Sequence, residues 1–206
     1  MPLVVRAEVV DLRTDTVKPT DVFLVDTNVW YWLTYPRASQ TPQPPAYYQT
    51  RYYPNYVKSA RKAGARLLFC GTVFAELAHR IESDEHKFFN ATLVAPISGK
   101  DFRHNYPRAR HDVQDEVAIA WGQVTSIAGI AAVPLDDATI ITTATLFGQV
   151  GLDGYDLIAV EAMRQNGVTH IITDDKDFLT VPGIVVLTAN NAAIQAAQAA
   201  GKLVTR

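Results

Sequence analysis

The feature that most constrains the fold is the apolar run 22–25, which leads directly into Asp26, Thr27 and Asn28. A short apolar run with β-branched residues and no polar alternation is typical of a strand buried on both faces of a parallel sheet. Asp26 is then expected at the carboxyl end of this strand, where open α/β sheets form their ligand crevice. An isolated Asp in such a place is more often a helix N-cap. Further carboxylates at the same edge would decide between the two roles.

Predicted strands and helices alternate along most of the chain. Strands are expected at 22–25, 66–70, 170–173 and 184–187. Helices are expected at 29–33, 73–88, 152–165 and 191–200, with Asp153 as the N-cap of the third. Two more helices are expected to begin at Asp112 and at Asp136 or Asp137, with a brief extended segment at 133–135. This alternation predicts a three-layer α/β/α sandwich with a central parallel sheet.

The 206 residues suggest one domain with additions. Residues 1–20 form a predicted N-terminal extension with a possible edge strand, residues 21–190 form the main domain, and residues 191–206 form its C-terminal helix. Four prolines between Pro36 and Pro45 predict an insertion at about 36–64 without regular structure until about Tyr56.

Composition excludes several classes of function. A content of 48 % hydrophobic and 19 % charged residues supports a full core, and a net charge of −2 means that any basic surface is local. The single cysteine, Cys70, excludes an internal disulfide, and no Cys/His cluster has zinc spacing. No apolar run approaches the ~20 residues of a membrane helix, and the N-terminus does not resemble a signal peptide. We expect a soluble, cytoplasmic protein with no membrane partner.

The predicted insertion has an unusual composition. It carries no acid, and its cations are interleaved with tyrosines. Cations for phosphates and aromatic faces for unstacked bases are the parts of a surface for single-stranded nucleic acid. An equally good interpretation is a Tyr-rich segment packed on the domain, with its cations on a solvated helix face. The candidate RNA-binding residues are Arg51, Tyr52, Tyr53, Lys58, Arg61 and Lys62.

Acids follow three predicted strands and occupy one neighbouring helix. They are Asp26, Glu76, the group Asp174, Asp175 and Asp177, and Asp156 in the first turn of helix 152–165. Strand ends of a parallel sheet share one edge, so these acids can converge. Converging carboxylates repel one another, and a bound cation removes the conflict. An all-oxygen ligand set suits Mg²⁺ or Mn²⁺, and phosphodiester hydrolysis is the chemistry that most needs it. The alternative is four unrelated helix caps.

Four short motifs in this order resemble those of the PIN-domain nucleases, in particular the VapC-like toxins of toxin–antitoxin pairs. They are Val-Asp-Thr-Asn, Ala-Glu-Leu, Tyr-Asp-Leu-Ile-Ala-Val-Glu-Ala and Ile-Ile-Thr-Asp-Asp-Lys-Asp-Phe. The resemblance covers residues 22–34, 66–82 and about 133–190. It implies a PIN-like fold, homodimerisation, an antitoxin partner, and Mg²⁺- or Mn²⁺-dependent endoribonuclease activity on single-stranded RNA.

Carried over residue by residue, the resemblance implies that Asp26, Glu76, Asp156 and Asp175 are the metal-binding acids. It implies supporting roles for Asn28 and Thr173, which would orient the first acid and a metal-bound water, and for Asp177. Asp174 stands where the family often has a basic or neutral residue, so the choice between Asp174 and Asp175 stays open. The extension and the insertion have no counterpart in the motif set.

Two other functions fit parts of the pattern. A phosphatase of the haloacid dehalogenase type also begins with a strand-end Asp, but it requires a second Asp where this chain has Asn28. A catalytically silent PIN-like module that binds RNA or a protein is the alternative from another class. The complete set of four acids argues against it.

Overall fold

The computed structural model describes residues 3–206, and a sheet of six parallel strands forms its centre. The strand order is β1-β6-β5-β2-β3-β4. The strands are β1 (Glu8–Asp11), β2 (Val22–Val25), β3 (Arg66–Cys70), β4 (Gly129–Ala131), β5 (His170–Ile172) and β6 (Val185–Thr188).

Strand β2 lies in the interior of the sheet, paired with β3 on one side and β5 on the other. From β2 the chain proceeds through β3 to β4, and it then crosses back to place β5 beside β2. The reversal of strand order between β2 and β5 is a topological switch point, and ligand crevices form outside the strand ends at such points. Asp26 follows β2, and Asp174 and Asp175 follow β5, so these predicted acids lie at the switch point.

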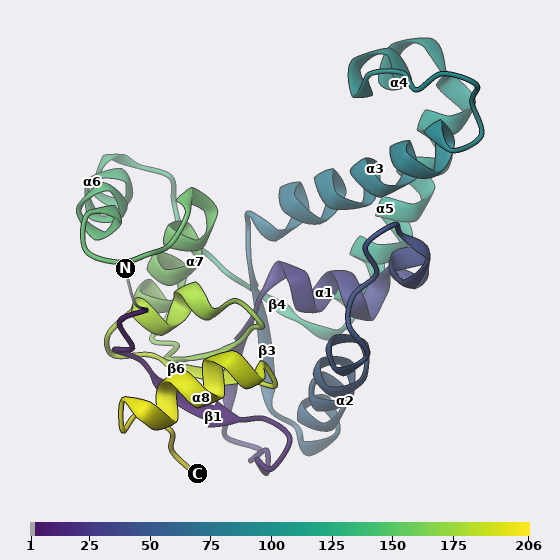
Figure 1. Ribbon diagram of the computed structural model, residues 1–206. Helices are drawn as coiled ribbons and strands as arrows, with labels where there is room; N and C mark the ends of the chain where they lie inside the picture. Colours follow the sequence, from purple (N-terminus) through teal and green to yellow (C-terminus); the bar gives the residue numbers. More distant parts are fainter. Residues whose placement is uncertain (1–2) are drawn as a thin grey trace.

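Helices flank the sheet on both sides, which confirms the predicted three-layer α/β/α sandwich (Figure 1). Helix α1 packs against α2, α3 and α5, whereas α6 packs against α7. The α-helices are α1 (Thr27–Thr34), α2 (Tyr47–Ala63), α3 (Val73–Asn90), α4 (Gly99–Asn105), α5 (Pro107–Ile127), α6 (Asp137–Phe147), α7 (Gly154–Gln165) and α8 (Asn191–Ala199). Two short 3₁₀ helices are η1 (Pro36–Gln40) and η2 (Lys176–Thr180). No helix within residues 3–206 is long and apolar enough to cross a bilayer.

Helices α3 and α5 form a long hairpin that projects away from the sheet, with α4 at its tip (Figure 1). Phe89 lies at this tip, 5.3 Å from the ring of Phe102 and 4.7 Å from that of Tyr106. Glu82 accepts hydrogen bonds from Arg103 and Arg110, which ties α3 to α4 and α5. The hairpin therefore has a small aromatic core of its own.

The possible edge strand in residues 1–20 is confirmed. Strand β1 pairs with β6, from Glu8 opposite Val185 to Asp11 opposite Thr188. On its outer side, Val9 donates to Lys202 O and accepts from Val204 N. The C-terminal segment thus covers an edge that would otherwise expose unpaired backbone groups.

The expectation of irregular structure up to about Tyr56 is wrong, because α2 begins at Tyr47. Tyr53, Tyr56, Val57 and Ala60 are buried on one face of α2 at helical spacing, against the core. Pro54 lies inside the helix, where a proline removes one backbone hydrogen bond. The burial of the aromatic face outweighs that loss.

Two other expectations are corrected. Asp112 does not begin a helix; α5 begins at Pro107, and proline is favoured at the first helical position because its missing N–H has no partner there. The brief extended segment expected at 133–135 lies outside the helices and strands, and strand β4 precedes it at Gly129–Ala131, where no strand was predicted. Asp136 does cap α6, accepting from Thr139 N at 2.9 Å.

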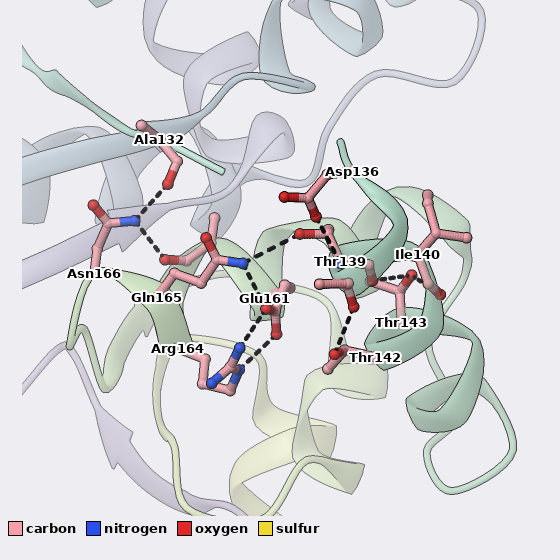
Figure 2. A network of polar contacts seen from close by, with 12 residues as sticks. Ala132, Asp136, Thr139, Ile140, Thr142, Thr143, Glu161, Arg164, Gln165 and Asn166 are labelled. Carbon is pink, nitrogen blue, oxygen red and sulfur yellow. Dashed lines mark hydrogen bonds and ion pairs between the residues drawn. The ribbon is translucent and has the colours of Figure 1, made fainter. Parts of the chain in front are cut away.

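A polar network joins α6 to α7 (Figure 2). Glu161 is 3 % exposed and accepts two hydrogen bonds from the guanidinium of Arg164, at 2.7 and 2.6 Å. Gln165 donates to Glu161 at 2.7 Å and to Thr139 Oγ1 at 3.2 Å. Glu161 belongs to one of the four motifs, yet its carboxylate accepts hydrogen bonds from Arg164 and Gln165 of its own helix, and the bond from Gln165 to Thr139 links α7 to α6.

Candidate metal centre

Asp26 combines the two roles that the sequence left open. Its carboxylate caps α1, because Oδ1 accepts from Thr27 N at 2.6 Å. Its other oxygen, Oδ2, accepts from the hydroxyl of Thr173 at 2.6 Å. Thr173 directly follows β5, and β5 lies beside β2 in the sheet. A hydroxyl at the end of β5 therefore orients Asp26 at the end of β2, as expected for Thr173.

Glu76 lies in the first turn of α3, and Thr27 connects it to the same point. The hydroxyl of Thr27 donates to Glu76 Oε2. The first turns of α1 and α3 therefore meet through a side-chain hydrogen bond, and the sequence analysis did not assign this role to Thr27. Its place between Asp26 and Asn28 in the first motif was the available signal.

Asp156 lies in the first turn of α7, where Asp153 caps the helix by accepting from Tyr155 N at 2.9 Å and Asp156 N at 3.1 Å. Asp26, Glu76 and Asp156 line one small cavity of about 10 Å³. A cavity needs about 10–15 Å³ of such volume to hold one water molecule. Three of the four predicted ligands therefore face one enclosed space of atomic size.

The structure places Asp174 and Asp175 in different surroundings. Asp174 accepts from Tyr53 at 2.6 Å, from Gln49 at 2.7 Å and from Tyr48 at 3.1 Å, so its carboxylate is held against α2. Asp175 donates its backbone N–H to Thr173 Oγ1 at 2.9 Å, the hydroxyl that holds Asp26.

The carboxylate of Asp175 is oriented by its own chain. Its Oδ1 accepts from Asp177 N at 2.8 Å, which caps η2. No side chain within residues 3–206 forms an ion pair with it. The surroundings thus favour Asp175, rather than Asp174, as the acid that joins Asp26 in the candidate metal centre.

The proximity of the acids appears in their pKa values. The pKa of Asp26 is raised to about 7, chiefly by burial; the charges of Glu76 and Asp175 also raise it, whereas the hydrogen bonds from Thr173 and Thr27 lower it. Burial likewise raises the pKa of Asp156 to about 8, with contributions from Asp26, Asp153, Asp175 and Glu76. Burial is also the main reason that the pKa values of Glu76 and Asp175 are raised.

These shifts identify Asp153 as a member of the group. Its charge contributes to the raised pKa of Glu76, Asp156 and Asp175. The sequence analysis treated Asp153 only as a helix cap, and capping geometry alone gives no sign that the same carboxylate also faces other acids.

The donor set fits a hard divalent cation in its chemistry. All four predicted ligands are carboxylates, and none of them forms an ion pair with a Lys, Arg or His in the described part of the chain. Oxygen donors of this kind suit Mg²⁺ and Mn²⁺. As the side chains stand, however, no three His, Cys, Asp or Glu residues among 3–206 are grouped closely enough to hold one ion together.

Asn28 does not behave as expected. It forms no hydrogen bond with Asp26, and its buried Oδ1 has no partner within the described chain. Buried polar atoms are usually hydrogen-bonded, so this oxygen is an exception within the described chain.

The candidate RNA-binding residues on α2 separate into two groups. Tyr53 is fully buried, so its ring cannot receive a base, and the packing interpretation is correct for it. Tyr52 is partly buried against the core. The exposed candidates, on the solvated side of the helix, are Arg51, Lys58, Arg61 and Lys62.

Comparison with known proteins gives little further information. No family model and no curated protein matches the chain. A solved structure that resembles it is the crystal structure of VapBC2 from Rickettsia felis bound to a DNA fragment of the promoter. The alignment covers 81 % of this chain and 98 % of that chain, with 11 % identity and a TM-score of 0.48. Similarity at this level assigns neither a family nor an activity.

Proposed function

We propose that the protein is a metal-dependent endoribonuclease of the PIN-like type, which hydrolyses phosphodiester bonds in single-stranded RNA. The observation that carries the proposal is the cavity lined by Asp26, Glu76 and Asp156 at the switch point of the sheet. Asp175 adds a fourth carboxylate, which contributes to the raised pKa of Asp26.

Unneutralised carboxylates close to one another destabilise the folded protein, and a bound cation would compensate for that cost. Asp26, Glu76, Asp156 and Asp175 would hold Mg²⁺ or Mn²⁺, which when bound activates a water and neutralises charge on the phosphate. The hydroxyls of Thr173 and Thr27 fix the orientations of Asp26 and Glu76. Groups that orient metal ligands typically change metal affinity or activity by about 10–100-fold when removed.

The direct test is cleavage of a labelled single-stranded RNA with Mg²⁺ or Mn²⁺. The wild-type protein is expected to cleave, and EDTA or Asp26→Asn is expected to abolish cleavage. Asp136→Asn is a matched control, since it makes the same acid-to-amide change at a helix cap outside the site, and Asn is an equally good cap. Activity that survives EDTA or Asp26→Asn contradicts the proposal.

Metal binding gives a second readout that does not require cleavage. A ligand that binds only the folded state stabilises it by RT ln(1 + [L]/Kd), which is about 2.7 kcal/mol at 100 times Kd. Mn²⁺ is therefore expected to raise the melting temperature of the wild-type protein and of Asp136→Asn, and to have little effect on Asp156→Asn.

A role as the toxin of a toxin–antitoxin pair, acting as a homodimer, is the biological form of this proposal. It is supported by the motif resemblance described above. Expression is then expected to arrest growth, Asp26→Asn is expected to relieve the arrest, and a small protein partner is expected to do the same. The competing function is a silent PIN-like module, which would bind RNA without metal-dependent cleavage and without growth arrest.

A further inference from the structure

A larger cavity lies beside the acids, between α1, α3, the first turn of α2 and the Pro-rich segment 41–45. Its volume is about 680 Å³. Sites for small organic ligands measure about 300–1,000 Å³. The proline-rich segment that appeared in the sequence as an interruption of regular structure forms one wall.

The cavity presents aromatic rings together with positive charge. The guanidinium of Arg80 lies over the ring of Tyr31, 4.1 Å from its centroid, and Arg80 forms no ion pair within residues 3–206. The one acid in the lining is Asp84, whose oxygens accept from Tyr31 at 2.7 Å and from Lys87 at 2.7 Å. Because Asp84 is buried and its charge is compensated by Lys87, Arg80 remains as a cation without an ion-pair partner in the described chain, stacked on the ring of Tyr31.

Two walls of the cavity connect directly with the acids. On α3, Arg80 follows Glu76 by four residues, which places it on the same face, about 6 Å further along the helix. On α2, Gln49 lines the cavity and donates to Asp174, the neighbour of Asp175. The cavity therefore lies next to Glu76 along α3 and reaches α2 at the residue that holds Asp174.

The same face of α1 carries unpartnered polar atoms. Trp32 lines the cavity, and its buried indole N–H has no hydrogen-bond partner in the described chain. Asn28, one helical turn earlier, has the unpartnered Oδ1 noted above. Both atoms have almost no exposed area, and Asn28 is not part of the cavity lining, so neither atom presents a polar group to the cavity.

We propose that this cavity binds the unpaired base of the nucleotide next to the cleaved phosphate, an inference that rests on the proposed ribonuclease function. A splayed base can stack on an arginine plane or an aromatic ring and use its polar edge for hydrogen bonds. Arg80, held flat on Tyr31, supplies the stacking plane and a charge for the RNA backbone. The side chain of Trp32 lines the same cavity beside this stacking plane. A paired base cannot enter, so the cavity selects single-stranded RNA.

The test measures binding without cleavage, by fluorescence anisotropy of a short labelled single-stranded RNA with Mg²⁺ in the Asp26→Asn background. Arg80→Ala is expected to weaken binding about tenfold, equivalent to about 1.4 kcal/mol. Arg108→Ala, an exposed arginine on α5 far along the sequence from the cavity lining, is the matched control and is expected to leave binding unchanged.

The same strand annealed into a duplex is expected to bind more weakly than the single strand, and to lose less affinity than the single strand when Arg80 is replaced. An affinity of Arg80→Ala equal to that of the Arg108→Ala control would overturn the proposal, whether or not the wild-type protein cleaves RNA. Loss of binding in Arg80→Ala would support the subsite even if no cleavage is found, so the two proposals fail separately. Melting temperatures of all variants establish that each is folded.

Discussion

The most direct test of the structural role of α2 is Tyr53→Phe, which removes one hydroxyl and leaves the ring in place. This hydroxyl donates to Asp174 Oδ1 at 2.6 Å, lies 2.9 Å from Thr188 Oγ1 and accepts from Ala189 N at 3.0 Å. Tyr53 is fully buried, so water cannot replace these bonds.

The magnitude follows from the groups that lose a partner. A buried donor left unsatisfied costs about 1–3 kcal/mol, and a hydrogen bond to a charged group contributes about 1.5–3 kcal/mol. Asp174 keeps Tyr48 and Gln49, and Thr188 keeps a hydrogen bond from Asn190 N, which limits the loss. We expect Tyr53→Phe to lower the free energy of unfolding by about 3 kcal/mol. In a chain of this size that corresponds to a fall in melting temperature of about 6–12 °C.

The assay is urea unfolding at neutral pH, with Tyr52→Phe as the control. The hydroxyl of Tyr52 forms no hydrogen bond within residues 3–206, so its removal is expected to change stability by no more than about 0.5 kcal/mol. Equal stabilities of the two variants would refute the reasoning. A loss of RNA affinity in Tyr53→Phe without any loss of stability would return Tyr53 to the group of RNA-binding residues.

Two further predictions separate structural from functional charges. Asp175→Asn is expected to abolish RNA cleavage and leave the fold intact, whereas Asp174→Asn is expected to lower the melting temperature and retain cleavage, because only Asp174 is held by α2. Equal loss of cleavage in both would show that the two acids act together. Arg206→Ala is expected to cost about 3–5 kcal/mol at pH 7, because it leaves the buried carboxylate of Asp15 without its ion-pair partner. Burial alone would raise the pKa of Asp15, but the hydrogen bonds from Arg206 and Tyr56 lower it overall, so this stability is present above about pH 3.9 and is lost as the pH falls through the lowered pKa. Melting temperatures of wild type and Arg206→Ala that do not converge in acid would contradict this account.

The sequence was sufficient for the features that short segments determine. An apolar run followed by an acid and a helix start defines each strand-to-helix junction locally, and parallel pairing then brings Asp26, Glu76 and Asp175 to one edge. The same local logic identified Asp153 as a helix cap and limited the cap of α6 to Asp136 or Asp137.

The features that the sequence did not predict depend on tertiary contacts. Pro42, Pro44 and Pro45 indicate a break in regular structure, but they do not show that a helix starts at Tyr47 and runs through Pro54. Burial of one face of α2 stabilises that helix, and burial is a property of the folded chain. The role of Asp153 among the acids and the absence of a bond between Asn28 and Asp26 likewise depend on distances that no sequence pattern specifies.

The buried tyrosine face also explains how the chain distinguishes between two adjacent acids. Asp175 has an extended backbone, with φ −76° and ψ 118°, and successive side chains on extended backbone point to opposite sides. Tyr48, Gln49 and Tyr53 hold Asp174 on the side of α2, and Asn190 donates to the backbone oxygen of Asp174 at 2.9 Å. With Asp174 fixed there, Asp175 is directed toward the opposite side, where Asp26 and Asp156 lie. The helix that appeared in the sequence as a candidate RNA-binding insertion thus helps to select which carboxylate joins the candidate metal centre.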